Sequence, residues 1–418
     1  MSHPGRHPLS SALRALASLR ITVVLLSLAI WLVFWATVGM KDLGIEEGVR
    51  VCFRQFFAYF DFRTGGGWDA ATGVVRPAQP VFRMWMPGGY LIGSAMLLNL
   101  LAAYLTRFKL RWSKLGIHMI HLGIAVILLG ELWTGLSSVE TQMILDEGET
   151  KNYSEVRDEC ELALVDVTDP GRETHFAIPR SRLEKGAQIA HPGLPFRVEV
   201  VEFLGNADIQ PGGEKPLPGY EPVAGDQGLA RMGLVWKKLP RDATMAGKNF
   251  PVARVRLHEG SRCLGTWIVS TQIPESQPVT SADSRHWELA LRLRREYKPF
   301  SLTLRDFQRN LYPGTTIAKD YSSFVTLTEK GLEQGRDVRI WMNHPLRHAG
   351  YTFYQSSFIN NDTTTILQVV RNPAWILPYV STTIVFLGLA IQFGISLNRF
   401  IGRKRTEPPS TSNPPAQP

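Results

Sequence analysis

Long apolar stretches alternate with polar segments along this 418-residue chain. A helix needs about 20 apolar residues to cross the hydrocarbon core of a bilayer. The stretches at 21–40, 84–106, 115–135 and 372–398 meet this length, and Glu131 near the end of the third would lie close to an interface. The first stretch is longer than a signal-peptide core and no A-x-A site follows it. The pattern therefore predicts four transmembrane helices, the first one uncleaved.

Basic residues cluster at one end of each of these stretches. They precede the first stretch, separate the second from the third, and follow the fourth: Arg6, Arg14, Arg20; Arg107, Lys109, Arg111, Lys114; Arg399, Arg403, Lys404, Arg405. Four crossings bring all three groups to one side, and basic flanks mark the cytoplasmic side. We therefore expect a multi-pass membrane protein with segment 1–20, loop 107–114 and a disordered tail 399–418 in the cytoplasm. Segments 41–83 and 136–371 then lie outside.

The large outer segment, 136–371, has the pattern of a β-rich domain. Apolar and polar residues alternate with a period of two at 196–200, 252–257 and 289–294. Such alternation, with Gly, Pro, Asp and Asn between the runs, predicts antiparallel strands with one face in solvent. The segment 206–248 is crowded with Gly and Pro, and we expect a long loop or insertion there.

The smaller outer segment, 41–83, contains a run of aromatic residues at 53–60. Their spacing suits a short helix. This helix would lie either at the membrane interface or against the main outer domain.

Composition narrows the function. The net charge is +9, but many basic residues stand beside the apolar stretches, which indicates membrane topology rather than nucleic-acid binding. The three cysteines, Cys52, Cys160 and Cys263, form no Cys-x-x-Cys pair. A thioredoxin-like site or a zinc ribbon is therefore unsupported, and we expect thiols that pack as small apolar groups, with one disulfide left open.

No catalytic motif is present. The chain lacks the GxSxG, HExxH, P-loop and helix-opening GxGxxG patterns. His344 and His348 have the spacing of a helical metal clip, but Pro345 bars the interior of a helix there. We expect no catalytic residue, and a binding, holding or assembly role.

The third apolar stretch contains two histidines, His118 and His121. An ionisable group inside a bilayer is costly and by default suggests a function. His121 is seven residues beyond Lys114, about 10 Å further into the membrane. A neutral imidazole there can ligate iron, relay a proton or bond across helices. The two histidines share a helix face, so they cannot take both axial positions of one haem.

The chain resembles the ResB (also CcsB) family of cytochrome c biogenesis proteins. Its layout of three spans, a long outer domain and a last span is similar to that of the family. So is the third span, where a small residue stands two after His121 and a glycine nine after it. The run 343–357 is similar to the family segment before the last span, and its matching residues are Asn343, Pro345, Leu346, Gly350, Tyr354 and Gln355.

The resemblance implies a System II maturation factor. With a ResC/CcsA-type membrane partner, such a protein moves haem across the membrane and supports its attachment to the Cys-x-x-Cys-His motif of apocytochrome c. The partner's tryptophan-rich motif is not found here, so this chain looks like an accessory subunit and catalysis is expected in the partner. The family's membrane histidine maps onto His121, and His118 has no such match.

Haem is then the expected cofactor, shared transiently with the partner, and no metal is expected apart from its iron. Haem propionates carry negative charge, and basic side chains stand beside the third span. We expect these propionates to meet one or more of Arg107, Lys109, Arg111 and Lys114.

The run 343–357 also has a purely structural interpretation. It predicts a strand, turns at Pro345 and Gly350, and a second strand that enters the core through Phe353. We therefore expect its matching residues to serve folding rather than contact with haem or apocytochrome.

Other functions remain as alternatives. A membrane-anchored sensor or binding module would need more cytoplasmic chain than the short segments here. A haem b subunit for electron transfer needs histidines on at least two spans, and the first, second and fourth contain none. A structural subunit of another membrane complex stays open.

Overall fold

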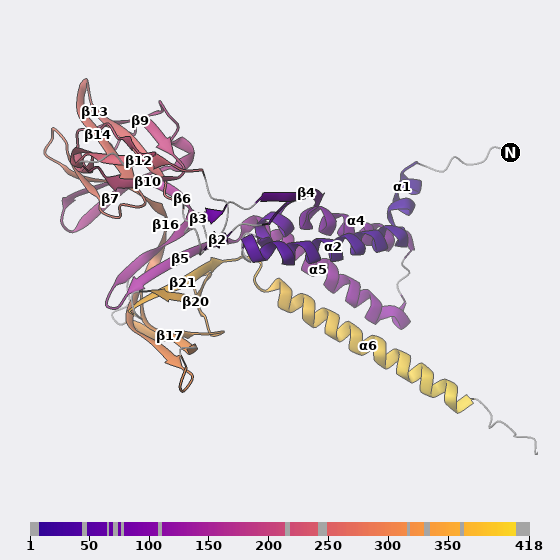
Figure 1. Ribbon diagram of the computed structural model, residues 1–418. Helices are drawn as coiled ribbons and strands as arrows, with labels where there is room; N and C mark the ends of the chain where they lie inside the picture. Colours follow the sequence, from indigo (N-terminus) through magenta and orange to yellow (C-terminus); the bar gives the residue numbers. More distant parts are fainter. Residues whose placement is uncertain are drawn as a thin grey trace, which may run out of the picture. The chain divides into compact units, whose positions relative to one another are not determined.

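The computed structural model describes residues 8–43, 48–64, 67–69, 74–76, 79–107, 111–213, 218–240, 249–315, 318–329, 335–359 and 363–406. The chain forms two compact units (Figure 1). One unit is Met1–Ser138 with Asn372–Pro418 and is mainly helical, and the other is Val139–Arg371 and is built of strands.

The helical unit contains α1 (Pro8–Leu16), α2 (Leu19–Leu43), α4 (Gly89–Arg107), α5 (Leu115–Ser137) and α6 (Leu377–Thr406). Four of its segments are long and apolar enough to cross a membrane: Leu19–Met40, Gly89–Arg107, Trp112–Ser137 and Leu377–Gly402. The prediction of four apolar helices beside a β-rich region is therefore confirmed. The disordered tail expected at 399–418 is corrected, because α6 continues to Thr406, and residues 407–418 lie outside the described residues.

Helices α5 and α6 pack closely because glycines line the contact. Gly116, Gly123 and Gly130 follow one another at seven-residue intervals and so stay on one face of α5. A Cβ atom added at Gly116 would lie 2.4 Å from the carbonyl oxygen of Gly388. The Ser381 hydroxyl donates to the Gly123 carbonyl at 2.8 Å. Small residues and a side-chain hydrogen bond of this kind hold helices together in membranes.

The segment before α4 does not form the helix that the sequence predicts. Residues 49–53 form a single π-helical turn, η1 (Val49–Phe53), and the aromatic run continues as strand β1 (Phe57–Thr64). Strand β1 pairs with β4 (Gln79–Pro87), so α4 begins at Gly89 rather than at residue 84. The expected helix at 53–60 is wrong because exposure alternates with a period of two, which is the period of a strand. A short β2–β3 pair (Gly67–Asp69 and Val74–Arg76) follows β1.

A ten-stranded antiparallel sheet dominates the β unit. Its order is β18-β17-β16-β6-β5-β21-β20-β19, with β7 beside β6 and β15 beside β16. The strands are β5 (Val139–Asp146), β6 (Thr150–Asp169), β7 (Arg172–Pro179), β15 (Gln277–Thr280), β16 (His286–Leu311), β17 (Ala318–Glu329), β18 (Arg336–Trp341), β19 (Leu346–His348), β20 (Tyr351–Ile359) and β21 (Thr364–Arg371).

Two smaller sheets complete this unit. One is β14-β13-β9-β8, from β8 (Gln188–Ile189), β9 (Arg197–Leu204), β13 (Val252–Glu259) and β14 (Arg262–Ser270). The other, β10-β12-β11, comes from β10 (Ala207–Pro211), β11 (Glu221–Pro222) and β12 (Leu234–Lys238). Of the expected long loop or insertion at 206–248, the loop interpretation is therefore corrected for the described residues, while residues 214–217 and 241–248 lie outside them. Ile209, Leu234 and Trp236 pack with Ile268 in a separate core, because apolar residues recur between its glycines and prolines.

The long strands β6 and β16 hold the β unit together. Near one end of β16, Trp287 and Leu289 are buried with Val255 and Leu257. Further along, Leu302 and Leu304 belong to a different core. The pairing of β16 with β6 shifts between Tyr297 and Leu302, between the two cores.

All three cysteines are free, so the disulfide left open by the sequence does not form in this structure.

Candidate functional site

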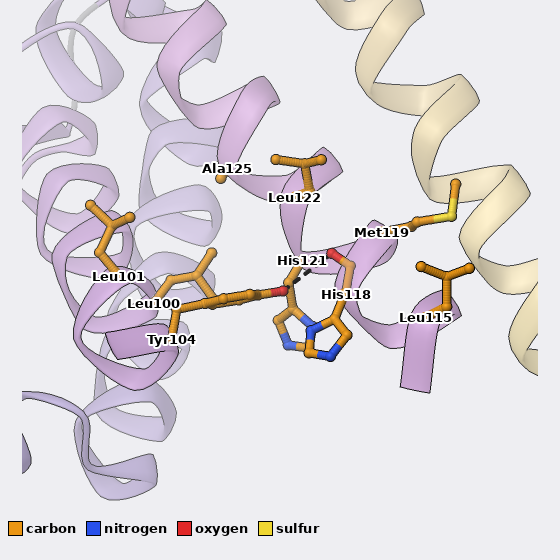
Figure 2. Close-up of a pocket in the computed structure, with 9 residues that line it drawn as sticks. All are labelled: Leu100, Leu101, Tyr104, Leu115, His118, Met119, His121, Leu122 and Ala125. Atoms are coloured by element: carbon orange, nitrogen blue, oxygen red, sulfur yellow. Dashed lines mark hydrogen bonds between the residues drawn. The ribbon is translucent and has the colours of Figure 1, made fainter. Parts of the chain in front are cut away.

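The two histidines of α5 line one pocket of about 430 Å³. They are three residues apart and therefore lie on one face of the helix. Figure 2 shows both imidazole rings pointing in the same direction. The remaining lining residues come from α4 and α5 and are Leu100, Leu101, Tyr104, Leu115, Met119, Leu122 and Ala125.

The backbone of α5 orients the ring of His121. Its Nδ1 atom is 2.7 Å from the carbonyl oxygen of Ile117, one turn earlier. A carbonyl oxygen only accepts hydrogen bonds, so Nδ1 carries the proton in this contact. In this tautomer, Nε2 is the ring atom with the lone pair that could ligate a metal. A histidine held in this way through Nδ1 is the usual form of a metal-ligating histidine.

Tyr104 joins α4 to the histidine face of α5. Its hydroxyl donates to the carbonyl oxygen of His118 at 3.2 Å (Figure 2). Its ring centre lies 5.8 Å from that of His118 and 6.1 Å from that of His121. Sequence reasoning missed Tyr104. The available signal was a phenol in an apolar span, three residues before the basic loop.

The pocket combines an apolar wall with few polar groups. His118 is buried at 9% exposure, while His121 is partly exposed. None of the lining residues is acidic, and most are aliphatic. A pocket of this size and character suits a flat, largely apolar ligand that is oriented by a few polar contacts. Haem binding through His121 stays a prediction.

The expected basic residues lie at the ends of the two pocket helices. Arg107 is the last residue of α4, and Lys114 directly precedes α5. Arg111, Lys114 and Arg107 are all exposed. Lys109 lies outside the described residues. Contact of these side chains with propionates stays a prediction.

The run 343–357 forms the predicted strand–turn–strand arrangement, with β19 added. Strand β18 ends at Trp341, and Asn343 then takes a left-handed backbone with φ 62°, which asparagine tolerates better than most residues. The two-residue turn at Ala349 (φ 47°) and Gly350 (φ 80°) connects β19 to β20. Positive φ at both central positions is typical of a tight hairpin turn.

Other matching residues of this run also have structural roles. Leu346 and Phe353 are buried in one core, and Pro345 directly precedes β19. The Gln355 amide donates to the Thr365 hydroxyl at 3.0 Å, and its oxygen accepts from Ser323 at 2.5 Å. Ser323 and Thr365 are fully buried, so Gln355 satisfies groups that have no access to water. Tyr354 is 37% exposed, and Asn343 and Gly350 are exposed as well.

His344 and His348 do not form a metal clip. The His348 Nε2 atom lies 2.5 Å from a carboxylate oxygen of Glu329, while the His344 ring stacks on Trp341 at 4.1 Å. Across the described part of the chain, no group of three or more His, Cys, Asp or Glu side chains is placed to hold a metal ion.

The strand–turn–strand run lies within a part of the chain that matches a known family. Residues 264–366, from β14 into β21, match the model of the ResB-like family. The resemblance to the ResB/CcsB family is therefore confirmed. The chain is also similar to Protein NrfI of Wolinella succinogenes, with 34% identity over 91 residues. That alignment covers 22% of this chain and 10% of NrfI, so the chain aligns with only a tenth of the length of that relative.

Proposed function

We propose that this chain is a cytochrome c biogenesis factor of the System II type. It works with a ResC/CcsA-type membrane partner, takes part in moving haem across the bacterial inner membrane, and supports its covalent attachment to the Cys-x-x-Cys-His motif of apocytochrome c. The match to the ResB-like family supports the general role. The observation that carries the haem role is the His121 imidazole, held through Nδ1 in an apolar pocket.

In this proposal the chain binds haem as a substrate to be passed on. His121 offers Nε2 as one axial ligand. His118 projects from the same face three residues away and cannot reach the opposite face of the same porphyrin. The second axial ligand then comes from the partner. The aliphatic wall formed by Leu100, Leu101 and Leu122 covers the apolar porphyrin surface.

In this proposal, the charges of the basic residues orient the haem. Arg107, Arg111 and Lys114 stand at the ends of the pocket helices, with Lys109 in the same loop. Cations placed there attract the two propionates toward the basic end of the pocket. The chain itself contributes binding and orientation, and the covalent step belongs to the partner.

The proposal is tested by reconstitution. This chain, a ResC/CcsA-type partner and a Cys-x-x-Cys-His reporter are co-expressed in a host without its own maturation system. We expect the reporter to carry covalent haem only when this chain is present. His121→Ala should lower that haem at least about tenfold, since it removes an iron ligand. The control is His286→Ala, which changes an exposed histidine of the β unit.

A second measurement separates ligation from folding. Added imidazole should partly restore reporter haem to a His121→Gly variant, because the small base can occupy the vacated space. Equal haem with and without this chain would refute the assembly role. If the chain is required but His121→Ala has no effect, the assembly role is retained and the pocket has no part in it. The chain would then act in the assembly as a structural subunit.

A further inference from the structure

The β1–β4 hairpin has one covered face and one open face. Cross-strand pairs alternate between them, with Ala58 opposite Met86 and Tyr59 opposite Trp85. Ala58 and Met86 are 0% and 5% exposed. On the other face, Trp85 is 71% exposed, Tyr59 37% and Phe57 63%. The open face is therefore large and aromatic, and the described residues of the helical unit leave it uncovered.

The covered face packs along α2. Its side chains share one core with Leu32 and Ala36, and a Cβ atom added at Gly39 would lie 3.9 Å from the Phe60 ring. The apolar stretch of α2 ends at Met40. Gly39, which faces the Phe60 ring, is one residue before that end, or about 1.5 Å along the helix. The hairpin thus contacts α2 where the apolar stretch ends.

The connection to α4 keeps the hairpin in this position. The Gly88 amide donates to the carbonyl oxygen of Phe56 at 2.8 Å, and the Tyr90 amide donates to that of Gln55 at 3.2 Å. Added Cβ atoms at Gly88 and Gly89 would come within 2.3 and 2.4 Å of backbone oxygens. The hairpin is therefore a fixed part of the helical unit.

Aromatic side chains gather at the same end of the other spans. Trp133 lies near the end of α5 and is 54% exposed, and Trp375 precedes α6 and is 48% exposed. Trp31, Phe34 and Trp35 pack on one another in the last part of the α2 stretch. Tryptophan and tyrosine favour the boundary between headgroups and acyl chains, since they combine an apolar ring with a polar atom.

We propose that the face formed by Phe57, Tyr59 and Trp85 lies in the outer headgroup boundary of the bilayer. The depth of α2 places it there, and its side chains suit that layer. The centre of the hydrocarbon is excluded, because a two-stranded hairpin leaves edge amides and carbonyls that need water. This inference rests on the membrane crossing of α2 and not on any haem role.

Depth-dependent quenching in liposomes tests this inference. The three native cysteines are replaced by alanine in the full chain, and a single new cysteine carries an environment-sensitive fluorophore. The vesicles contain phosphatidylcholine and phosphatidylglycerol, with a spin label either near the headgroup or deep in the acyl chain. We expect Trp85→Cys to be quenched several-fold more strongly by the shallow label than by the deep one. Tyr59→Cys provides a second position if the first variant folds poorly.

Two control positions interpret the result. Ile30→Cys, at a 71% exposed site in α2, should respond most to the deep label, and Met232→Cys, 65% exposed in the β unit, should respond to neither. If the Ile30 site is quenched but the Trp85 site, like the Met232 site, is not, the inference is overturned while the membrane crossing stands. An unquenched Ile30 site instead refutes the membrane crossing. Quenching at the Trp85 site that vanishes when the ResC/CcsA-type partner is added assigns this face to protein and also overturns the inference.

Discussion

The helical unit and the β unit differ in what surrounds their apolar side chains. Of the most apolar window in each candidate span, only 11% to 22% is buried within the structure. In the β unit, by contrast, Trp287 is 1% exposed and Leu289 and Val255 are 0% exposed. A helix that is apolar all round needs an apolar solvent or a partner, whereas sheets that pack face to face build their own core.

The polar groups of the two units differ in the same way. In the β unit, Gln355 bonds to buried hydroxyls and His348 lies against Glu329, so these side chains serve the fold. In the helical unit, His118 and His121 line a pocket with mostly aliphatic walls. This difference supports the proposal that the helices carry the binding chemistry, while these polar side chains of the strands serve the fold.

The largest effect is expected at the contact between α5 and α6. A Cβ atom at Gly123 would lie 2.5 Å from the Val385 side chain and 3.0 Å from the carbonyl oxygen of Ser381. Gly123→Leu should therefore separate the two helices and cost more than about 3 kcal/mol, above the usual range for overpacking, because backbone is in the way. We expect most of the protein to be lost from the monodisperse fraction after extraction in mild detergent.

The matched control for this change is Gly394→Leu in α6. No atom lies within 4 Å of a Cβ atom added there. This variant should keep the yield and melting temperature of the unchanged chain. Equal losses from both leucines would show that close packing at Gly123 is not the cause, because leucine has the higher helix propensity and a gain would otherwise be expected at Gly394.

An intermediate effect, of opposite sign, is expected at Lys298 in the β unit. This lysine is 5% exposed, donates to the Ser154 hydroxyl at 2.6 Å and lies 4.5 Å above the Tyr351 ring. Burial lowers its pKa from 10.5 to about 8, and the charge of Glu296 offsets this only in part. The unfolded chain therefore binds more protons between these two values, and stability rises with pH across that range.

Lys298→Met should accordingly stabilise the β unit. The penalty of the charged form is fully present below about pH 8 and amounts to at most roughly 3 kcal/mol, from 1.36 kcal/mol per pKa unit. We expect a gain of about 1–2 kcal/mol near pH 7, after loss of the Ser154 bond, and a smaller gain near pH 10. Denaturant unfolding at both pH values measures it, and Lys238→Met, at a half-exposed site, is the control. A gain that does not change with pH would show that desolvation of the charge is not its cause.

Much of this architecture follows from the sequence because it depends on local patterns. Uncharged stretches are long enough to fix the four apolar helices, and the alternation at 252–257 and 289–294 corresponds to strands β13 and β16. The prediction of a helix at 53–60 was wrong because a short local pattern can fit two kinds of secondary structure. Aromatic spacing over eight residues fits either period, and only the partner strand β4, some 20 residues later, decides between them.

Only part of the candidate site could be predicted from the sequence. Two histidines in an apolar span stand out in the sequence, since polar groups are rare there. Tyr104 did not stand out, because its role depends on how α4 packs beside α5. The Nδ1 contact of His121 depends on a side-chain rotamer and a backbone oxygen, which spacing alone does not fix.

The smallest predicted effect tests whether the family-matching run belongs to the structural side of this comparison. Gly350 has φ 80°, and no atom lies within 4 Å of a Cβ atom added there, so Gly350→Ala changes only the backbone preference. We expect a loss of about 1 kcal/mol, read as a lower melting temperature, and a smaller loss for Gly350→Asn. Gly213→Ala, also in open space, should be neutral or slightly stabilising. Reporter haem should fall only as far as the amount of folded protein falls. A larger fall in haem than in folded protein would move this turn from the fold to the surface that meets the haem or the apocytochrome.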